Sequence, residues 1–458
     1  MKIYNTLTRK TEEFKPIKEG YVGIYSCGPT VYWNQHIGNV YAYIQWDTMV
    51  RALRYQGYKV KWVMNITDVG HNTSDADEGE DKMEKGARRE GLSVWQIADK
   101  YIAQFTDSLN KLDVQPDVLA RATEHIQEQV DLARAIEKNG FAYKTNVGLV
   151  YDTSKFLDYA KFAKLNNKDQ QAGARTEVDI DKRQPLNFLL WVTNQPNHIM
   201  QLDSPWGKGF PGWHLECTAM STKYLGKRFD IHTGGKEHIP VHHSNEIAQA
   251  YGAFGQQTAN YWLHNEWLTF GGEKVSKSSG KTNILVTDLI IKGYDPLALR
   301  YLVLSSNYQK GLSFTWESLD AAQKALTRLR IKVSSLNSEN GQIRSDYKEE
   351  FINALNDNLN FTKALSVLWK LLNDEKVTKP LKYETALSFD TVLGLNLSLP
   401  PKEESMVIPR RALELAKLRE KLRVERRFEV ADKIRQEIRV MGYEIEDTKT
   451  GVKWHKAE

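Results

Sequence analysis

Apolar residues in the first part of the chain follow the pattern of a strand, a helix and a second strand. The segment YVGIYSCG is strand-like and ends at Cys27 and Gly28. After a short loop, apolar side chains recur at steps of three and four residues, which marks one face of a helix: Tyr43, Trp46, Val50 and Leu53. Gly57 stands where such a helix would end, and KVKWVMNIT follows as a second apolar strand. This alternation predicts a βαβ unit and therefore a parallel sheet.

The pattern is less regular in the middle of the chain. Residues 71–91 are almost wholly polar, so we expect a solvated loop leading into a helix that begins near Ser93. The DADEG run in this loop resembles a calcium-binding loop, but Gly79 stands one place too early and no Glu follows at the twelfth position, which excludes that site. Charged helical periodicity occupies 93–140, and 141–200 is mixed, with short strand-like segments such as GLVYD and FLLWV.

Helical periodicity dominates the C-terminal part. Beyond Pro296 almost every segment is typical of a helix, as far as the Leu399-Pro400-Pro401 sequence, which we interpret as a linker. Residues 407–442 predict a charged helix or a pair of helices, and the segment YEIEDTKTGVKWH predicts a closing hairpin.

Composition adds limits rather than a function. A chain of 458 residues is too long for one core and suggests two to four domains. No segment approaches the roughly 18 consecutive apolar residues of a membrane span, and the polar first residues show no secretory signal. We therefore expect a cytoplasmic protein without a membrane partner. The net charge of +5 is compatible with nucleic acid but does not by itself indicate it.

The sequence His36-Ile37-Gly38-Asn39 stands where the first loop meets the predicted helix. A helix start offers free N–H groups and a positive dipole end, which favour phosphate. Gly38 would let a ligand approach the backbone, and His36 could donate to an oxygen that gains charge. Alone the motif is weak, because a histidine near a helix start is more often structural.

A second motif, Lys274-Val275-Ser276-Lys277-Ser278, lies between glycines. Two lysines in such a loop suit a clamp on a polyphosphate, although a lysine-rich surface turn is the simpler interpretation. The nearby Gly280-Lys281-Thr282 imitates the end of a Walker A loop, but that motif would need glycine where Val275 stands.

Six of the eleven histidines fall in the block from 214 to 264. His242 and Glu246 are four residues apart and share a helix face, and with the chain's two cysteines, Cys27 and Cys217, they could form a tetrahedral zinc set. No zinc-hydrolase motif can be drawn through these histidines. Buried structural histidines and buried free thiols stay open as alternatives. Two cysteines are too few for a disulfide framework.

The ordered pair of HIGN and KVSKS resembles the HIGH and KMSKS motifs of class I aminoacyl-tRNA synthetases. Within that class the chain is similar to the cysteinyl-tRNA synthetase family, which carries the motifs CGPTVY, GWHxECxAM and HHxNEIAQ that occur here. The segment PLALRYLVLSSNY resembles the helical anticodon-binding domain of the DALR type, and RRFEVADKIRQEIRVMGYEIEDTKTGVKW resembles the family's C-terminal tail.

The resemblance implies an α/β protein: a Rossmann-like catalytic domain with a parallel sheet, an α-helical anticodon-binding bundle and a small C-terminal domain. Its implied segments are the catalytic first half with HIGN (1–115), a connective insertion (116–200), the catalytic second half with the KVSKS loop (201–295), the DALR-type domain (296–400) and the C-terminal domain (401–458).

The resemblance also implies the activity, which is ATP-dependent formation of cysteinyl-adenylate and transfer of cysteine to its tRNA. One zinc ion per chain would bind and select the thiol of the cysteine substrate. Mg²⁺ would accompany ATP, and the protein would act as a monomer. The implied metal ligands are Cys27, Cys217, His242 and Glu246. The implied catalytic and nucleotide-binding residues are His36, Gly38, Asn39, Glu237, Lys274 and Lys277. The implied cysteine-binding residues are Gly28, Thr67, Trp213 and His232.

Several positions depart from the family pattern without removing an implied metal ligand or Lys277, so we expect an active enzyme: Asn39, Tyr41, Ser244, Val275 and Lys281. Two alternatives share the same motifs. One is a ligase that joins cysteine to an amino sugar, which generally lacks an extension such as 405–458. The other is an inactive paralogue that binds zinc or tRNA.

Overall fold

The computed structural model describes residues 1–70, 81–164, 182–195, 198–274, 283–336, 341–399, 409–425, 427–448 and 451–456. The chain divides into two compact units, Met1–Leu399 and Pro400–Glu458.

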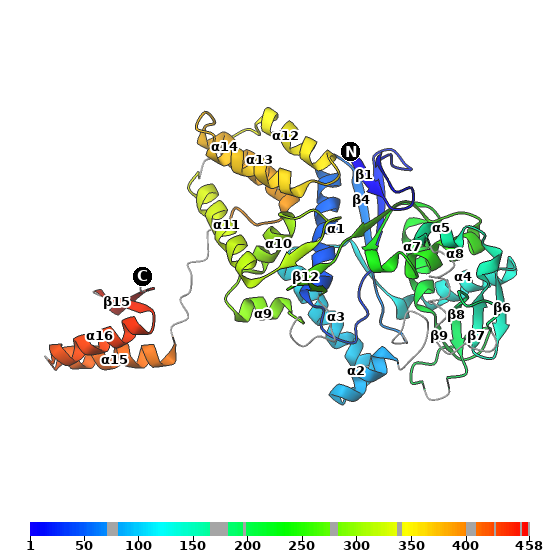
Figure 1. Ribbon diagram of the computed structural model, residues 1–458, viewed down its shortest axis with the longest axis horizontal. Coiled ribbons are helices and arrows are strands. Elements are labelled where there is room, and N and C mark those ends of the chain that lie inside the picture. Colours follow the sequence, from blue (N-terminus) through cyan, green and yellow to red (C-terminus); the bar gives the residue numbers. More distant parts are fainter. Residues whose placement is uncertain are drawn as a thin grey trace. The chain divides into compact units, whose positions relative to one another are not determined.

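A five-stranded parallel sheet forms the centre of the first unit (Figure 1). Its strands, in spatial order, are β11 (Ala259–Asn265), β10 (Phe229–Gly235), β3 (Tyr21–Ser26), β4 (Lys59–Ile66) and β5 (Val118–Arg121). The helix α1 (Ile37–Tyr55) joins β3 to β4, which confirms the predicted βαβ unit. Gly57 follows the helix with a φ of 95°, in the conformation that glycine adopts without strain.

A separate hairpin and a long helix from the first part of the chain accompany the central sheet. The hairpin of β1 (Lys2–Asn5) and β2 (Lys10–Glu13) precedes the sheet. Helix α3 (Val94–Lys111) begins as predicted after Ser93, whose side chain forms a capping box with Gln96.

The expectation of a loop throughout 71–91 is wrong for its second half, because Lys82–Glu90 form helix α2. Asp81 caps this helix by accepting from the Glu84 N–H, and Gly91 ends it at a φ of 66°. The polar sequence concealed the helix because its buried face consists only of Met83, Gly86 and Ala87. Residues 71–80, including Gly79 and the acidic run, lie outside the described residues.

A second, antiparallel sheet lies to one side of the central sheet (Figure 1), in the order β6 (Ala142–Thr145), β7 (Gly148–Tyr151), β8 (Phe188–Thr193) and β9 (Gly209–Pro211). The strand-like segments GLVYD and FLLWV are β7 and β8, as predicted. The neighbouring helices are α4 (Ile126–Lys138), α5 (Tyr159–Ala163), α7 (Trp213–Leu225) and α8 (His242–Phe254).

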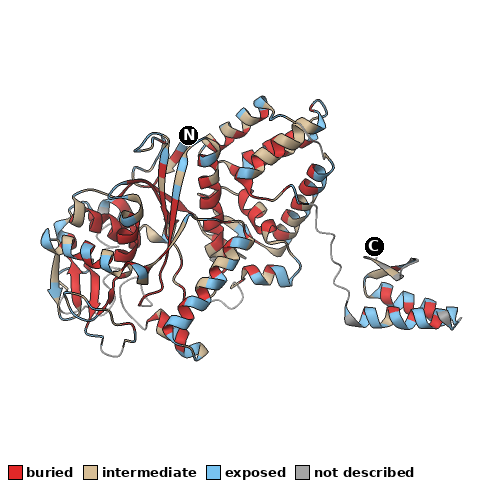
Figure 2. Cartoon of the chain, turned by 180° about the vertical axis from the view of Figure 1, so that it is seen from behind, coloured by how far each residue is buried: buried red, intermediate tan, exposed pale blue. Residues whose placement is uncertain are grey.

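The remainder of the first unit is mainly helical, as the periodicity predicts. Three short strands, β12 (Leu268–Phe270), β13 (Glu273–Lys274) and β14 (Leu312–Phe314), form a small sheet. The helices are α9 (Val286–Ile291), α10 (Pro296–Leu304), α11 (Trp316–Ser334), α12 (Ser345–Asn356), α13 (Phe361–Asn373) and α14 (Lys379–Leu393). Their apolar faces share one core with α1 and the central sheet, and Figure 2 shows the buried residues running through both.

The second unit is a pair of helices with a hairpin, as predicted: α15 (Arg410–Val424), α16 (Phe428–Val440), β15 (Tyr443–Thr448) and β16 (Gly451–Lys456). Its small core includes Leu422, Ile434 and Ile445. No described helix in either unit is long and apolar enough to cross a membrane.

Candidate functional site

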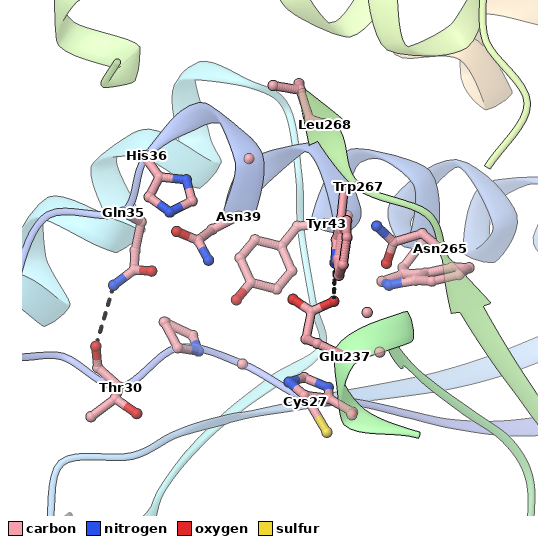
Figure 3. Close-up of a pocket in the computed structure, with 18 of the residues that line it drawn as sticks. Cys27, Thr30, Gln35, His36, Asn39, Tyr43, Glu237, Asn265, Trp267 and Leu268 are labelled. Carbon is pink, nitrogen blue, oxygen red and sulfur yellow. Dashed lines mark hydrogen bonds between the residues drawn. The ribbon is translucent and has the colours of Figure 1, made fainter. Parts of the chain in front are cut away.

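A cavity of about 350 Å³ opens where the carboxyl ends of β3 and β10 meet the start of α1 (Figure 3). Ligands bind at this edge of open parallel sheets, because loops diverge there and helix starts point toward it. The cavity is lined by residues from five separate stretches of the chain: Cys27–Thr30, Tyr32 and Gln35–Trp46 in part; Lys82; Trp213; Gly234–His238 in part; and Asn265, Trp267 and Leu268.

The start of α1 forms one wall of the cavity. His36 is the residue before the helix, and its side chain makes no capping bond to the first N–H groups. The first turn contains no acidic residue, so the positive end of the helix dipole is not neutralised locally. Gly38 and Asn39 also line the cavity, and the buried Asn39 Oδ1 has no hydrogen-bond partner among the described residues. This wall is suited to an anionic oxygen of a ligand.

Glu237 lies across the cavity from that wall, in the 3₁₀ turn Lys236–His238 after β10 (Figure 3). The Trp267 indole N–H donates to its carboxylate at 2.8 Å, and the Lys236 ammonium stands 3.7 Å from the centre of the Trp267 ring. A Cβ added at Gly235 would come within 2.4 Å of the Glu237 carboxylate, so glycine leaves this acceptor its space. A fixed carboxylate is well suited to accept hydrogen bonds from hydroxyl groups.

A buried cluster of thiol, imidazole and carboxyl groups adjoins the cavity at Cys27. The atoms that Cys27, Cys217, His242 and Glu246 could offer to a metal all lie within 4.8 Å of one another. The His242 Nε2 is 3.1 Å from the Glu246 carboxylate, and the Cys27 Sγ is 3.9 Å from it. Ligand atoms of one tetrahedral zinc ion stand roughly 3.3–3.8 Å apart. The four residues therefore fit that ion.

A second set shares Cys27 and Glu246 but replaces the other two residues by His232 and His243. The His243 Nε2 lies 3.2 Å from the Cys27 Sγ and 3.9 Å from the Glu246 carboxylate. Sequence reasoning missed His243 as a candidate, although it stands three residues before Glu246 and so shares the same helix face. The HH pair therefore offers two imidazoles to one carboxylate.

Burial dominates the electrostatics of this cluster. It raises the pKa of the Cys27 thiol, with the neighbouring Cys217 adding to the effect, and it raises the pKa of the Glu246 carboxyl. It lowers the pKa of His232 to about 3, and nearby His238 contributes. These groups are thus held neutral when nothing compensates their charge. A bound divalent cation would supply that compensation and favour the thiolate and carboxylate forms.

Each of the two central imidazoles has a partner on its far side. The His242 Nδ1 lies 2.8 Å from the His214 Nδ1, and the His243 Nδ1 lies 2.7 Å from the His264 Nε2. His264 in turn contacts the Thr6 hydroxyl at 2.8 Å. Contacts of this kind fix the orientation and tautomer of imidazoles at metal sites.

The predicted cysteine-binding residues divide into two groups. Gly28 and Trp213 line the cavity, and the Trp213 ring stacks on His242 with the centroids 4.1 Å apart. Thr67 and His232 are fully buried and are not among the described lining residues. His232 lies against the thiol cluster, 3.6 Å from the Cys27 Sγ.

A chain of hydrogen bonds that sequence reasoning did not find connects Thr67 to Gly28. The Gly28 N–H donates to the Asn65 side-chain oxygen at 2.7 Å, and the Asn65 amide donates to the Thr67 hydroxyl at 3.3 Å. Thr67 donates to the Glu216 carboxyl at 2.7 Å. Burial raises the pKa of Glu216, which favours its neutral form. These hydrogen bonds hold the turn after Cys27 against the end of β4.

The described residues include only the beginning of the KVSKS motif. Lys274 ends β13, and its side chain is not described. Lys277, Val275 and Lys281 lie outside the described residues, so their predicted roles stay predictions.

Comparison with known proteins adds independent findings. Residues 13–324 match the family model of the tRNA synthetases class I (C) catalytic domain. The chain is 46% identical to cysteine–tRNA ligase 1 of Burkholderia lata, over 98% of this chain and 95% of the relative. It is 40% identical to the cysteine–tRNA ligase of Treponema denticola, over 100% and 99% of the two chains.

Among solved structures, methionyl-tRNA synthetase of Mycobacterium tuberculosis in complex with methionyl-adenylate superposes with a TM-score of 0.56. The match covers 82% of this chain and 90% of the other at 15% identity, so it bears on the fold alone.

Proposed function

The chain belongs to the cysteine–tRNA ligases of the class I aminoacyl-tRNA synthetases, and on this basis we propose that a zinc ion held by Cys27, Cys217, His242 and Glu246 selects its thiol substrate. The enzyme activates cysteine with ATP and transfers it to tRNA. The match to cysteine–tRNA ligases over nearly the whole chain favours this activity over the amino-sugar ligase.

One observation carries the zinc proposal: the chain has two cysteines, and both lie in one buried cluster with His242 and Glu246 beside the cavity. Two sulfurs with one imidazole and one carboxylate are a zinc donor set. We prefer it to the set with His232 and His243. That set has one thiolate and two imidazoles, whereas the preferred set has two thiolates, and thiolate is the softer ligand that suits zinc. When bound, the ion would supply an acceptor for a substrate thiolate that the harder, less acidic hydroxyl of serine cannot match.

The protein's own groups position the other parts of the substrates. In the proposal, His36, Asn39 and the backbone at Gly38 hold phosphate oxygens of ATP at the start of α1. Glu237 accepts hydrogen bonds from the ribose hydroxyls, and Trp213 forms a wall of the cysteine pocket. Lys274 and Lys277 stabilise the leaving pyrophosphate, with Mg²⁺ bound to ATP. The cysteine carboxylate then attacks the α-phosphorus, and the tRNA ribose hydroxyl takes the cysteinyl group in the second step.

We further propose that the enzyme works as a monomer in the cytoplasm, where tRNA charging supplies translation. Gel filtration with light scattering would test the monomer, and a stable dimer would contradict it.

Exchange of pyrophosphate into ATP tests the proposed selection directly. We expect cysteine to support exchange much better than serine does. A pocket that discriminates by shape alone separates two such substrates by at most roughly 200-fold, so the kcat/KM for cysteine divided by that for serine should exceed this value. The protein should also contain one zinc per chain by elemental analysis. Absence of cysteine-dependent exchange would reject the enzyme, and charging of tRNA with cysteine completes the test.

Gly28→Ala is expected to lower kcat/KM for cysteine by about 100-fold, since displacing a substrate-positioning group by an ångström has that scale of effect. The added methyl group would lie 1.7 Å from the Asn65 carbonyl oxygen, and so the turn after Cys27 must move. Steady-state exchange kinetics measure the change.

Gly23→Ala, on the strand β3 that leads into this turn, provides the matched control. Its methyl group would meet its nearest neighbour, Phe229, at 3.4 Å, which is an ordinary contact distance. Equal losses in the two variants would contradict the role assigned to the Gly28 turn.

A further inference from the structure

One cationic side chain reaches the cavity from an element that the proposed mechanism has not used. Among the described residues that line the cavity, Lys82 is the only lysine or arginine. It is the first residue of α2, and it is only partly buried. Its ammonium lies 5.9 Å from the centre of the Trp213 ring. The charge therefore lies near the pocket wall that stacks on His242.

The start of α2 is held in place by contacts on both sides of Lys82. Asp81 lies 3.2 Å from the His198 Nε2 through its carboxylate. Glu84, one turn later, accepts from the Ile199 N–H at 2.7 Å. His198 itself stacks on Phe210 with the ring centroids 4.2 Å apart. These contacts tie the helix start to residues 198–200, so Lys82 extends from a fixed backbone position into the cavity.

We propose that Lys82 binds the carboxylate of the cysteine substrate and orients it for attack on ATP. The inference rests on the proposed function, since it assumes that the substrate thiol binds at the metal cluster that includes His242, next to Trp213. Trp213 contacts the imidazole of His242 on one side, and the Lys82 ammonium lies near the same ring. Only two carbon atoms separate the sulfur of cysteine from its carboxyl carbon, so a substrate anchored by sulfur places its carboxylate close by.

The chemistry of the first step gives this cation a purpose. An oxygen of the cysteine carboxylate forms a bond to the α-phosphorus of ATP, and the bond from that phosphorus to the bridging oxygen breaks. Pyrophosphate departs with the electron pair, and no proton is transferred. Two anions must approach for this step. An ammonium group beside the nucleophile reduces their repulsion and fixes the attacking oxygen, and Lys82 remains protonated throughout.

The test compares cysteine with cysteamine, which keeps the thiol and the amine but lacks the carboxylate. In Lys82→Ala we expect the KM for cysteine in pyrophosphate exchange to rise by roughly 10- to 100-fold, the scale of one charge-assisted hydrogen bond. The inhibition constant of cysteamine and the KM for ATP should stay within about twofold of the unmodified enzyme. Lys82→Arg should recover part of the loss, since it retains the charge.

Lys85→Ala is the matched control, because Lys85 is exposed on the same helix, and it should leave all three constants unchanged. Equal weakening of cysteine and cysteamine, a change confined to the KM for ATP, or no change would each overturn the inference. These outcomes are distinct from failure of the proposed function, in which the unmodified enzyme itself would show no cysteine-dependent exchange.

Discussion

Cys217→Ser is expected to remove most of the zinc from the purified protein and to raise the KM for cysteine at least about tenfold. A serine hydroxyl is not deprotonated at neutral pH as a zinc-bound thiol is, so the substituted site keeps three of its four donors. Cys217 is buried in α7, and the substitution changes the volume of the side chain little. Elemental analysis gives the zinc content, and pyrophosphate exchange gives the KM.

His125→Gln supplies a control for the loss of a buried donor elsewhere. His125 is buried and contacts the Arg121 carbonyl and the Tyr224 hydroxyl at 2.7 and 2.9 Å. Zinc content should be unaffected by this change. A full zinc content in Cys217→Ser would refute Cys217 as a ligand.

Two further variants decide between the two donor sets. If Cys217 and His242 belong to the metal set, His242→Gln should lose zinc to a similar extent as Cys217→Ser, whereas His243→Gln should retain it. The reverse pattern would assign the ion to His232 and His243. The distances alone leave both sets close to one centre, because they share Cys27 and Glu246.

The sequence predicted the elements whose pattern is regular and whose burial is continuous. The βαβ unit, the strands GLVYD and FLLWV, the helices after Pro296 and the closing hairpin were all predicted correctly. Helix α2 was not, because small or isolated residues form its buried face: Met83, Gly86 and Ala87. A short helix with so few apolar residues gives almost no periodic signal.

Among the residues of the candidate site, too, those related by a local sequence pattern were predicted, and those that come together from distant segments were not predicted from pattern alone. The HHxNEIAQ motif brought His242 and Glu246 together by local helix geometry alone. Cys27 and Cys217 were candidates as the chain's two cysteines, but only the family resemblance assigned them to this site, since no local pattern joins the residue after β3 to one on α7. Lys82 and Asn65 had no sequence signal of this kind, because their neighbours in the site come from distant segments. Lys277 lies outside the described residues, and its role stays a prediction.

A second large effect is expected far from the cavity, at Arg300 in α10. Its guanidinium is fully buried and donates to the carbonyl oxygens of Leu393, Leu112 and Asp113 at 2.6, 3.0 and 3.0 Å. It also pairs with Asp47 of α1 at 2.5 Å. The helix that begins at the HIGN motif is thus joined through one side chain to α10 and to the end of α14.

Arg300→Met is expected to lower the free energy of unfolding of the first unit by about 3–5 kcal/mol, because it leaves a buried carboxylate and three carbonyl groups without this donor. Urea denaturation followed by tryptophan fluorescence measures the change. Arg344→Met is the surface control: Arg344 pairs with Asp346 at 2.8 Å, but both side chains are exposed, so we expect no measurable loss.

The double variant Asp47→Asn with Arg300→Met separates the two sources of this energy. If the unpaired Asp47 charge is the main cost, the double variant should be more stable than Arg300→Met alone. The coupling between the two sites is the loss in the double variant minus the losses in Arg300→Met and in Asp47→Asn measured separately. Asp47 also pairs with Arg51 at 2.7 Å, which limits that recovery. A double variant no more stable than the single one would place the energy in the three carbonyl contacts instead. In that case Arg300 would stabilise the junction of α1, α10 and α14 as a hydrogen-bond donor rather than as the partner of a charge.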